Sequence, residues 1–196
     1  AQRSDGVTVE NSSLSRGVPP TADTLVYVDD SDGNLKSLAP GTRAVTDYGV
    51  QARVVGPAAF LDNATAPEVP YVGTDGALRL VDANGETTKL VADSTAAEPV
   101  ESRSKLAVDD RVAGRPAVLY AGADGGLYRV DADDQTPTPL GATETVQFVV
   151  GVFDADRDGS RDTVYISSGS GLRYVDGETG EDLSTPVDST WGVNDQ

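Results

Sequence analysis

The stretch DADRDGSRD, residues 154–162, has the residue types and spacing that most directly suggest chemistry. Its candidate ligands fall on alternate residues: Asp154, Asp156, Asp158, Ser160 and Asp162. Calcium takes about six to eight hard oxygen ligands, and alternating aspartates around a tight turn can direct three carboxylates to one point. Gly159 permits such a turn. The pattern predicts one calcium site, in which Ser160 offers its backbone carbonyl and Asp162 closes the site directly or through water.

Two other interpretations of this loop are an EF-hand and a solvated acidic turn. An EF-hand loop ends in a bidentate glutamate at its twelfth position, but here that position is Tyr165, and TVYIS after the loop is typical of a strand. The loop could instead be a solvated acidic turn that binds sodium or nothing, because short motifs often arise by chance. A loop that joins two strands agrees better with the sequence than an EF-hand does.

Related positions elsewhere in the chain have lost most of the pattern. Counting back from Tyr120 aligns Asp109 with Asp154, but the later ligand positions are occupied by non-acidic residues: Arg111, Ala113 and Ala117. The corresponding loop before Tyr71 is shorter and keeps only Asp62 and Glu68 at its ends. One intact loop among degenerate ones predicts an ion that stabilises one part of the fold.

The elements that must position this loop are repeats. Four segments each combine an apolar run around a tyrosine, a glycine turn and a later leucine: TLVYVDDSDGNLKSL, VPYVGTDGALRLVDANGETTKL, AVLYAGADGGLYRVDADDQTPTPL and TVYISSGSGLRYVDGETGEDLS. Their tyrosines are Tyr27, Tyr71, Tyr120 and Tyr165, and their leucines are Leu35, Leu78, Leu127 and Leu172. We expect the tyrosines to pack in the core, and we assign the same role to Trp191.

Each repeat is expected to contain three or four antiparallel strands. Asp-Gly between two short apolar runs is a strong hairpin signal, and a second hairpin turns at Asn84-Gly85. Further apolar runs, ARVVGPAAFL, SKLAVDD and VQFVVGVF, precede the later tyrosines. Modules of this kind predict an all-β protein, a small β-propeller of four blades, with a five-bladed ring or a β-sandwich as alternatives.

Two family resemblances accompany this pattern. VYISSGSGLRYVDGETGEDLS resembles the quinoprotein-type propeller repeat, and VVGVFDADRDGSRDTVYIS resembles the FG-GAP and VCBS repeats of integrin-like propellers. In the latter repeats a D-x-D-x-D-G-x-x-D loop joins two strands of one blade. The resemblances imply a propeller, but they imply no enzymatic activity, because propellers serve many functions.

The domain organisation follows from the repeats. Residues 1–20 are expected to be a linker or an extra strand, and residues 21–196 a single propeller domain. The first repeat lacks the strand that precedes the other tyrosines. Either TWGVNDQ at the end of the chain or GVTVE at residues 6–10 could supply it and close the ring.

The charge indicates the environment of the protein. The formal net charge is -17, aspartate greatly exceeds glutamate, arginine exceeds lysine, and histidine, cysteine and methionine are absent. Such a surface resembles that of proteins from extreme halophiles, because molar salt screens its self-repulsion. We therefore expect instability at low salt. No basic patch exists to neutralise phosphates, so nucleic acid is not an expected partner.

The sequence also suggests a location. No apolar run approaches the roughly 20 residues that span a bilayer, so we expect no direct membrane insertion. The chain starts at Ala1 rather than methionine, which suggests a removed N-terminal signal or anchor. Sequons at Asn11 and Asn63 are compatible with a glycosylated surface protein. The expected location is extracellular or at the cell surface, in high salt.

These observations favour a non-enzymatic role. Without histidine or cysteine, Ser-His-Asp and Cys-His catalysis are impossible. We predict a calcium-stabilised recognition, adhesion or scaffold module whose partner is an unknown protein or glycan at the cell surface. The alternatives are a glycan-binding module or fragment of a secreted carbohydrate-active enzyme, and a structural subunit of a surface filament.

Overall fold

A computed structural model describes most of the chain, and all its regular elements are β-strands. The described residues are 25–39, 41–59, 61, 67–91, 105–109, 116–132, 135–177 and 179–184. Within them, no helix is long and apolar enough to cross a membrane. The predicted all-β class is confirmed. The N-terminal segment 1–20, both sequons and Trp191 lie outside the described residues.

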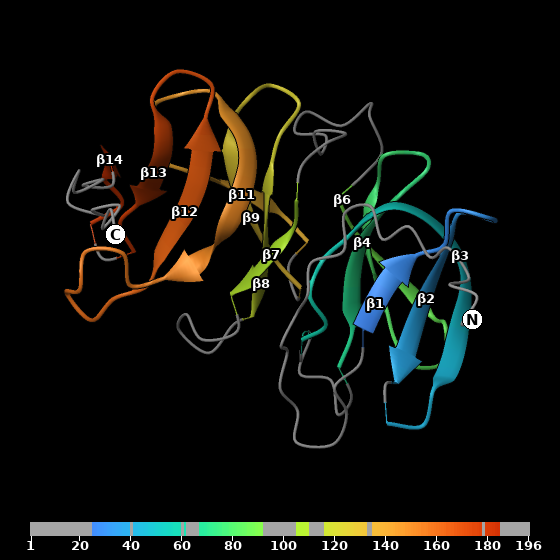
Figure 1. Cartoon of the computed structure of the whole chain (residues 1–196). Coiled ribbons are helices and arrows are strands. Elements are labelled where there is room, and N and C mark those ends of the chain that lie inside the picture. The colour runs from blue at the N-terminus through green and yellow to red at the C-terminus, as the bar shows by residue number, and fades with distance from the viewer. Residues whose placement is uncertain are drawn as a thin grey trace, which may run out of the picture.

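The strands form four sheet units, which we call the first to fourth blades (Figure 1). The first blade comprises β1 (Leu25–Val28), β2 (Asn34–Ala39) and the first half of β3 (Ala44–Val55). The second comprises the rest of β3, β4 (Val69–Gly73), β5 (Leu78–Val81) and β6 (Thr87–Val91). The third comprises β7 (Ala107–Asp109), β8 (Ala117–Ala121), β9 (Leu127–Asp131) and β10 (Pro137–Leu140). The fourth comprises β11 (Val146–Phe153), β12 (Asp162–Ser167), β13 (Gly171–Val175) and β14 (Asp182–Ser184).

Strand β3 belongs to two blades. Its residues up to Gln51 pair with β2, and Ala52 to Val55 pair with β4, so the first two blades form one six-stranded sheet. The sequence predicted the second half as part of ARVVGPAAFL but missed the first half. That half is largely exposed and rich in polar residues, so it lacks the apolar run that marks a buried strand.

The predicted hairpin turns are confirmed. The glycine of each turn adopts a positive φ between 74° and 86°, a backbone conformation that glycine accepts without steric cost: Gly33, Gly76, Gly85, Gly125 and Gly171. Each turn therefore reverses the chain between two paired strands, as the Asp-Gly and related patterns indicated.

The blades pack face to face through three apolar cores. One core joins the first blade to the second, another joins the second to the third, and the last joins the third to the fourth. The four repeat tyrosines are buried, as predicted: Tyr27, Tyr71, Tyr120 and Tyr165. Among the described residues, no such core joins the fourth blade to the first. The segments proposed to close the ring, residues 6–10 and the C-terminal TWGVNDQ, lie outside the described residues.

Candidate metal centre

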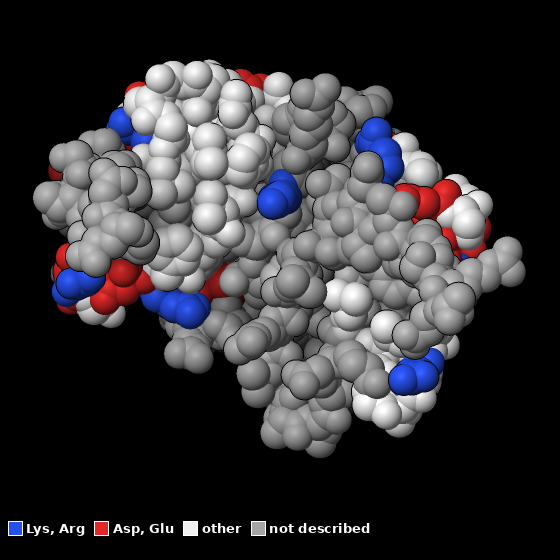
Figure 2. Space-filling view, in the orientation of Figure 1, with Lys and Arg blue, Asp and Glu red and all other residues white. Residues whose placement is uncertain are grey.

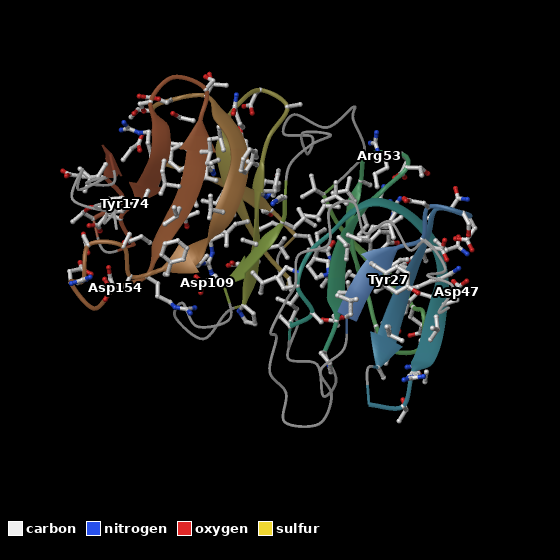
Figure 3. The ribbon with its side chains drawn as sticks, viewed as in Figure 1. Tyr27, Asp47, Arg53, Asp109, Asp154 and Tyr174 are labelled. Carbon is white, nitrogen blue, oxygen red and sulfur yellow. The ribbon has the colours of Figure 1, made fainter. Side chains whose placement is uncertain are left out.

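The aspartate loop joins β11 to β12 in the fourth blade, the strand-to-strand position that the sequence predicted. The two strands pair up to Phe153 and Asp162, and the intervening residues form the loop, near which Figure 3 labels Asp154. Gly159 has a φ of 96°, and Arg157 also has a positive φ, of 70°. The loop therefore makes the tight turn that the glycine was expected to permit.

Backbone N–H groups within the loop hold its carboxylates in place. Ala155 N–H donates to Asp162 Oδ2 at 2.6 Å. Gly159 N–H donates to Asp154 Oδ2 at 3.2 Å. These bonds leave further lone pairs on the same carboxylates, because each ionised carboxylate can accept about four hydrogen bonds or ligand contacts.

Five carboxylates of the fourth blade converge, and we call them the carboxylate cluster: Asp154, Asp156, Asp158, Asp162 and Asp176. They form two overlapping triads with oxygen atoms within 4.8 Å of one another, namely Asp154–Asp156–Asp162 and Asp156–Asp158–Asp176. Asp156 belongs to both triads. Asp162 and Asp176 are buried, whereas the other three are exposed. Each triad could hold a metal ion. At the lower left, where Figure 3 labels Asp154, Figure 2 shows acidic side chains beside basic ones.

Ser160 is the one predicted ligand outside both triads. Its backbone N–H and its hydroxyl donate to Asp158 Oδ1 at 2.7 and 2.8 Å. The side chain thus orients a carboxylate of the second triad. The ligand role of its backbone carbonyl stays a prediction.

Asp176 is the residue that sequence reasoning missed. It follows β13, and pairing of Thr163 with Val175 brings that end of β13 beside the start of β12. The neighbouring Gly177 N–H donates to Asp162 Oδ1 at 3.1 Å. The repeat provides a signal for Asp176, since an aspartate also follows the equivalent strand as Asp82.

That signal points to a turn rather than to a metal site. Asp82 Oδ1 accepts hydrogen bonds from the N–H groups of Asn84 and Glu86, and Asp176 Oδ1 accepts one from Thr179 N–H at 2.6 Å. Both aspartates thus cap the hairpin that follows their strand. Only strand pairing in the fourth blade shows that Asp176 also lies beside the aspartate loop.

Crowding of like charges changes the electrostatics of the cluster. Desolvation raises the pKa of Asp156, and the nearby charges of Asp158, Asp162 and Asp176 raise it further. Tyr174 donates from its hydroxyl to Asp156 Oδ2 at 3.4 Å. Desolvation and the charge of Asp156 raise the pKa of Tyr174 in turn. A bound cation would relieve this repulsion.

The donor set suits a hard divalent cation. All five groups are carboxylates, which calcium and magnesium prefer, and a softer metal would favour sulfur or imidazole. Asp156 could bind an ion in either triad. An ion in the first triad would also contact Asp162 at the start of β12, and an ion in the second would contact Asp176 after the end of β13. The residues therefore fit a structural cation that links the loop to β12 or to β13.

The related position in the third blade has a different role. Asp109 is buried and forms ion pairs with Arg129 and with Arg161 of the aspartate loop, both at 3.4 Å. Strand pairing places it opposite Ala117, as Phe153 lies opposite Asp162, so Asp109 corresponds to Phe153 rather than to Asp154. Counting back from the tyrosines aligned Asp109 with Asp154 instead, because the loop after Asp109 is one residue shorter.

Comparisons with known proteins concern the fold. No protein-family model matches the chain, and no curated protein matches it in sequence. The solved structures that resemble it include BamB from Moraxella catarrhalis, a quinoprotein-like β-propeller, with 20% sequence identity and a TM-score of 0.51. The match covers 85% of this chain and 50% of BamB, so the chain spans about half the length of that protein. With its face-to-face sheets, this chain has a fold of the β-propeller type, as the repeats predicted.

Proposed function

We propose that the chain is a non-enzymatic, calcium-stabilised β-propeller that serves as a recognition, adhesion or scaffold module outside a halophilic cell. The observation that carries the proposal is the carboxylate cluster, in which two triads share Asp156. A cation there would connect the aspartate loop to the end of β13 and so stabilise the fourth blade. The resemblance of the loop to FG-GAP and VCBS repeats supports the choice of calcium.

The halophilic and extracellular parts of the proposal rest on composition. A net charge of -17 on 196 residues suits a protein whose self-repulsion is screened by molar salt. The absence of histidine and cysteine from the sequence removes the usual nucleophile and base pairs, which favours binding over catalysis. A recognition module agrees with both features.

Thermal unfolding in molar potassium chloride tests the calcium site. The wild type should melt about 5–10 °C higher with calcium at roughly 100 times its Kd than with EDTA, since a ligand that binds only the folded state stabilises it. Asp156→Asn should abolish this shift. The matched control is Asp82→Asn, which alters a turn aspartate outside the cluster and should keep the shift. A wild type that does not respond to calcium would overturn the metal proposal.

Salt dependence tests the halophilic part of the proposal. Transfer from molar potassium chloride to dilute buffer lengthens the Debye length from about 3 Å to about 30 Å and exposes the -17 charge to its own repulsion. The melting temperature should fall by on the order of 10 °C or more. A melting temperature that is independent of salt would contradict the assignment to a halophile.

A second candidate function, glycan binding, is favoured by a hollow on the described surface. A hollow of about 420 Å³ lies between the β8–β9 turn and the start of β11. Its lining includes the polar Asp124 and Gln147 and the aromatic Phe148, a combination that suits a sugar ring. Binding to a panel of polysaccharides at high salt, lost in Phe148→Ala, would favour this function. Sustained hydrolysis of any of them would contradict a non-enzymatic module.

A further inference from the structure

The first three blades hold the aspartate of one hairpin turn in the same way. This aspartate precedes the turn glycine in each repeat: Asp32, Asp75 and Asp124. Its Oδ1 accepts a hydrogen bond from the backbone N–H two residues later, at 2.9–3.1 Å. Its Oδ2 accepts a hydrogen bond from the side chain four residues later, at 2.5–2.7 Å. The partner of this carboxylate can therefore be compared from blade to blade.

That partner is a cation in two blades and a neutral side chain in the third. The first blade supplies Lys36 and the second supplies Arg79. In the third blade, Tyr128 donates its hydroxyl to Asp124. None of the ion pairs among the described residues involves Asp124. The third blade thus keeps the turn carboxylate without the cation that accompanies it in the first and second.

Asp124 lines the hollow between the β8–β9 turn and the start of β11. The hollow has a volume of about 420 Å³, and Asp124 is the one charged residue of its lining. On the β11 side, Phe148 contributes an aromatic ring and is only partly buried. Lys105 Nζ lies 5.8 Å from the centroid of that ring, so the ring already lies beside one ammonium group. The hollow therefore combines a carboxylate that pairs with no described cation and an aromatic surface.

We propose that this hollow binds a lysine side chain of a partner protein, with the ammonium group on Asp124 and the methylene stem along Phe148. The inference rests on the recognition role proposed above and names the chemistry of the partner. Lysine has both features that the lining matches, because it joins a positive end to an apolar stem. A neutral sugar could stack on the ring but would supply no cation to Asp124.

A contact of this kind suits a protein that works at high salt. At molar salt the Debye length is about 3 Å, so the -17 charge of the chain attracts distant cations only weakly. An ammonium group and a carboxylate in a hydrogen bond lie about 2.7–2.9 Å apart, which is within that length. Lys36 and Asp32, at 2.7 Å, form such a pair in this chain. Selection of a basic partner would therefore depend on contact at the hollow rather than on the overall charge.

An NMR titration of the full chain in molar potassium chloride tests the proposal. The probe is Nα-acetyl-lysine amide, and the readout is the movement of the backbone amide signals of Gly122, Gly125 and Gly126 as the probe is added. These signals should move and reach saturation, because the three glycines belong to the turn that lines the hollow or adjoins it. Acetylation of the probe at Nζ removes its charge and should weaken binding about tenfold or more.

Three variants separate the role of Asp124 from that of the rest of the hollow. Asp124→Asn keeps the shape of the side chain, removes its charge and should weaken binding of the probe about tenfold or more. Tyr128→Lys gives the third blade the cation that Lys36 gives the first, and it should weaken the probe to a similar extent. The matched control is Asp75→Asn, which alters the equivalent aspartate of the second blade and should bind the probe as the wild type does. Thermal unfolding checks that each variant folds. Because Tyr128 is buried, Asp124→Asn decides the outcome if Tyr128→Lys does not fold.

Four results would overturn the proposal. They are the absence of a saturable shift, equal binding of the Nζ-acetylated probe, binding that survives Asp124→Asn, and binding of glucosamine at least as tight as that of the lysine probe. The last result would assign the hollow to amino sugars rather than to a protein. The calcium-dependent melting shift of the carboxylate cluster is measured separately. A failed titration with an intact calcium shift would therefore contradict the lysine site and leave the calcium site in place.

Discussion

Two acidic clusters at opposite ends of the chain differ in how they balance their charge. In the first blade, Lys36 Nζ lies 2.7 Å from both Asp29 Oδ2 and Asp32 Oδ2 and 3.9 Å from Asp47 Oδ2, a set we call the lysine-centred cluster. Hydrogen bonds from Lys36 and Ser31 hold the pKa of Asp29 well below its usual range. In the carboxylate cluster of the fourth blade, desolvation and like charges raise the pKa of Asp156 instead.

The contrast shows what distinguishes a candidate cation site from an acidic turn. DDSDGNLK in the first repeat has as many aspartates before its glycine as DADRDG has in the fourth, but a lysine from the next strand lies among them. In the carboxylate cluster, strand pairing adds a further aspartate, Asp176, rather than a lysine. The density of aspartate alone therefore does not identify a metal site.

The largest effect is expected where the carboxylate cluster is held by close backbone packing. A Cβ at Gly177 would lie 1.9 Å from the carbonyl oxygen of Arg161, so Gly177→Ala must displace the aspartate loop or the turn after β13. Overpacking of this kind costs about 1–3 kcal/mol, which corresponds to a loss of about 3–10 °C in melting temperature. Calcium should also stabilise this variant less than the wild type.

Gly41→Ala is the matched control for that variant. A Cβ at Gly41 would meet no atom within 4 Å, so the substitution should leave both the melting temperature and the calcium shift near those of the wild type. Equal melting temperatures for the two variants would show that the loop and the turn are not packed as described.

A smaller effect is expected from removing the lysine side chain of the lysine-centred cluster in the first blade. Lys36→Met leaves Asp29, Asp32 and Asp47 close together without their lysine, so the melting temperature should fall by roughly 2–6 °C. In a chain that already carries Asp156→Asn, the same substitution should restore a calcium response, because it turns the lysine-centred cluster into a set of carboxylates.

Lys89→Met is the charge-matched control, since Lys89 is exposed on β6. It removes one positive charge without exposing a group of carboxylates and should create no calcium response. A Lys36→Met variant that behaves like Lys89→Met would mean that the lysine does not neutralise the first cluster.

Much of the fold could be predicted because the same three residues recur in the same order in every repeat. The tyrosine, the glycine turn and the leucine recur together, and each has one physical role: a core side chain, a reversal of the chain and a contact with the following blade. Leu172 is the exception, since it is 37% exposed whereas Leu35, Leu78 and Leu127 are buried. The first half of β3 was missed because exposed strands leave no apolar pattern.

The candidate site was only partly predictable, for a similar reason. The loop from Asp154 to Asp162 is local, so alternation and a glycine sufficed to find it. Asp176 joins the cluster through pairing between β12 and β13, which local spacing does not encode. The alignment of Asp109 shows the same limit. Because the two loops differ in length, counting along the chain aligned Asp109 with Asp154, one residue away from its structural counterpart Phe153.

The smallest expected effect is the pH dependence of stability, which should have opposite signs in the two clusters. The folded-state pKa of Asp156 is raised above its ordinary value of 3.8. At a pH between the unfolded-state and folded-state pKa values, Asp156 is therefore protonated in the native state and ionised in the unfolded state. Without calcium, the ionised carboxylate of Asp156 destabilises the folded state at a pH above its folded-state pKa. This loss of stability disappears as the pH falls to 3.8. For Asp29 the folded pKa is lowered, so its stabilisation is complete above 3.8 and is lost as the pH falls below that value.

Melting curves in EDTA from neutral to acidic pH, for the wild type and two variants, measure the sign of the stability change in each cluster. At neutral pH, Asp156→Asn should melt slightly higher than the wild type and Asp29→Asn lower, each by about 1–3 °C. The Asp156→Asn difference should close as the pH approaches 3.8, whereas the Asp29→Asn difference should begin to close only below it. Differences of the same sign would show that the two clusters share one electrostatic character, because neutralising a carboxylate raises stability only where repulsion between like charges outweighs attraction to cations.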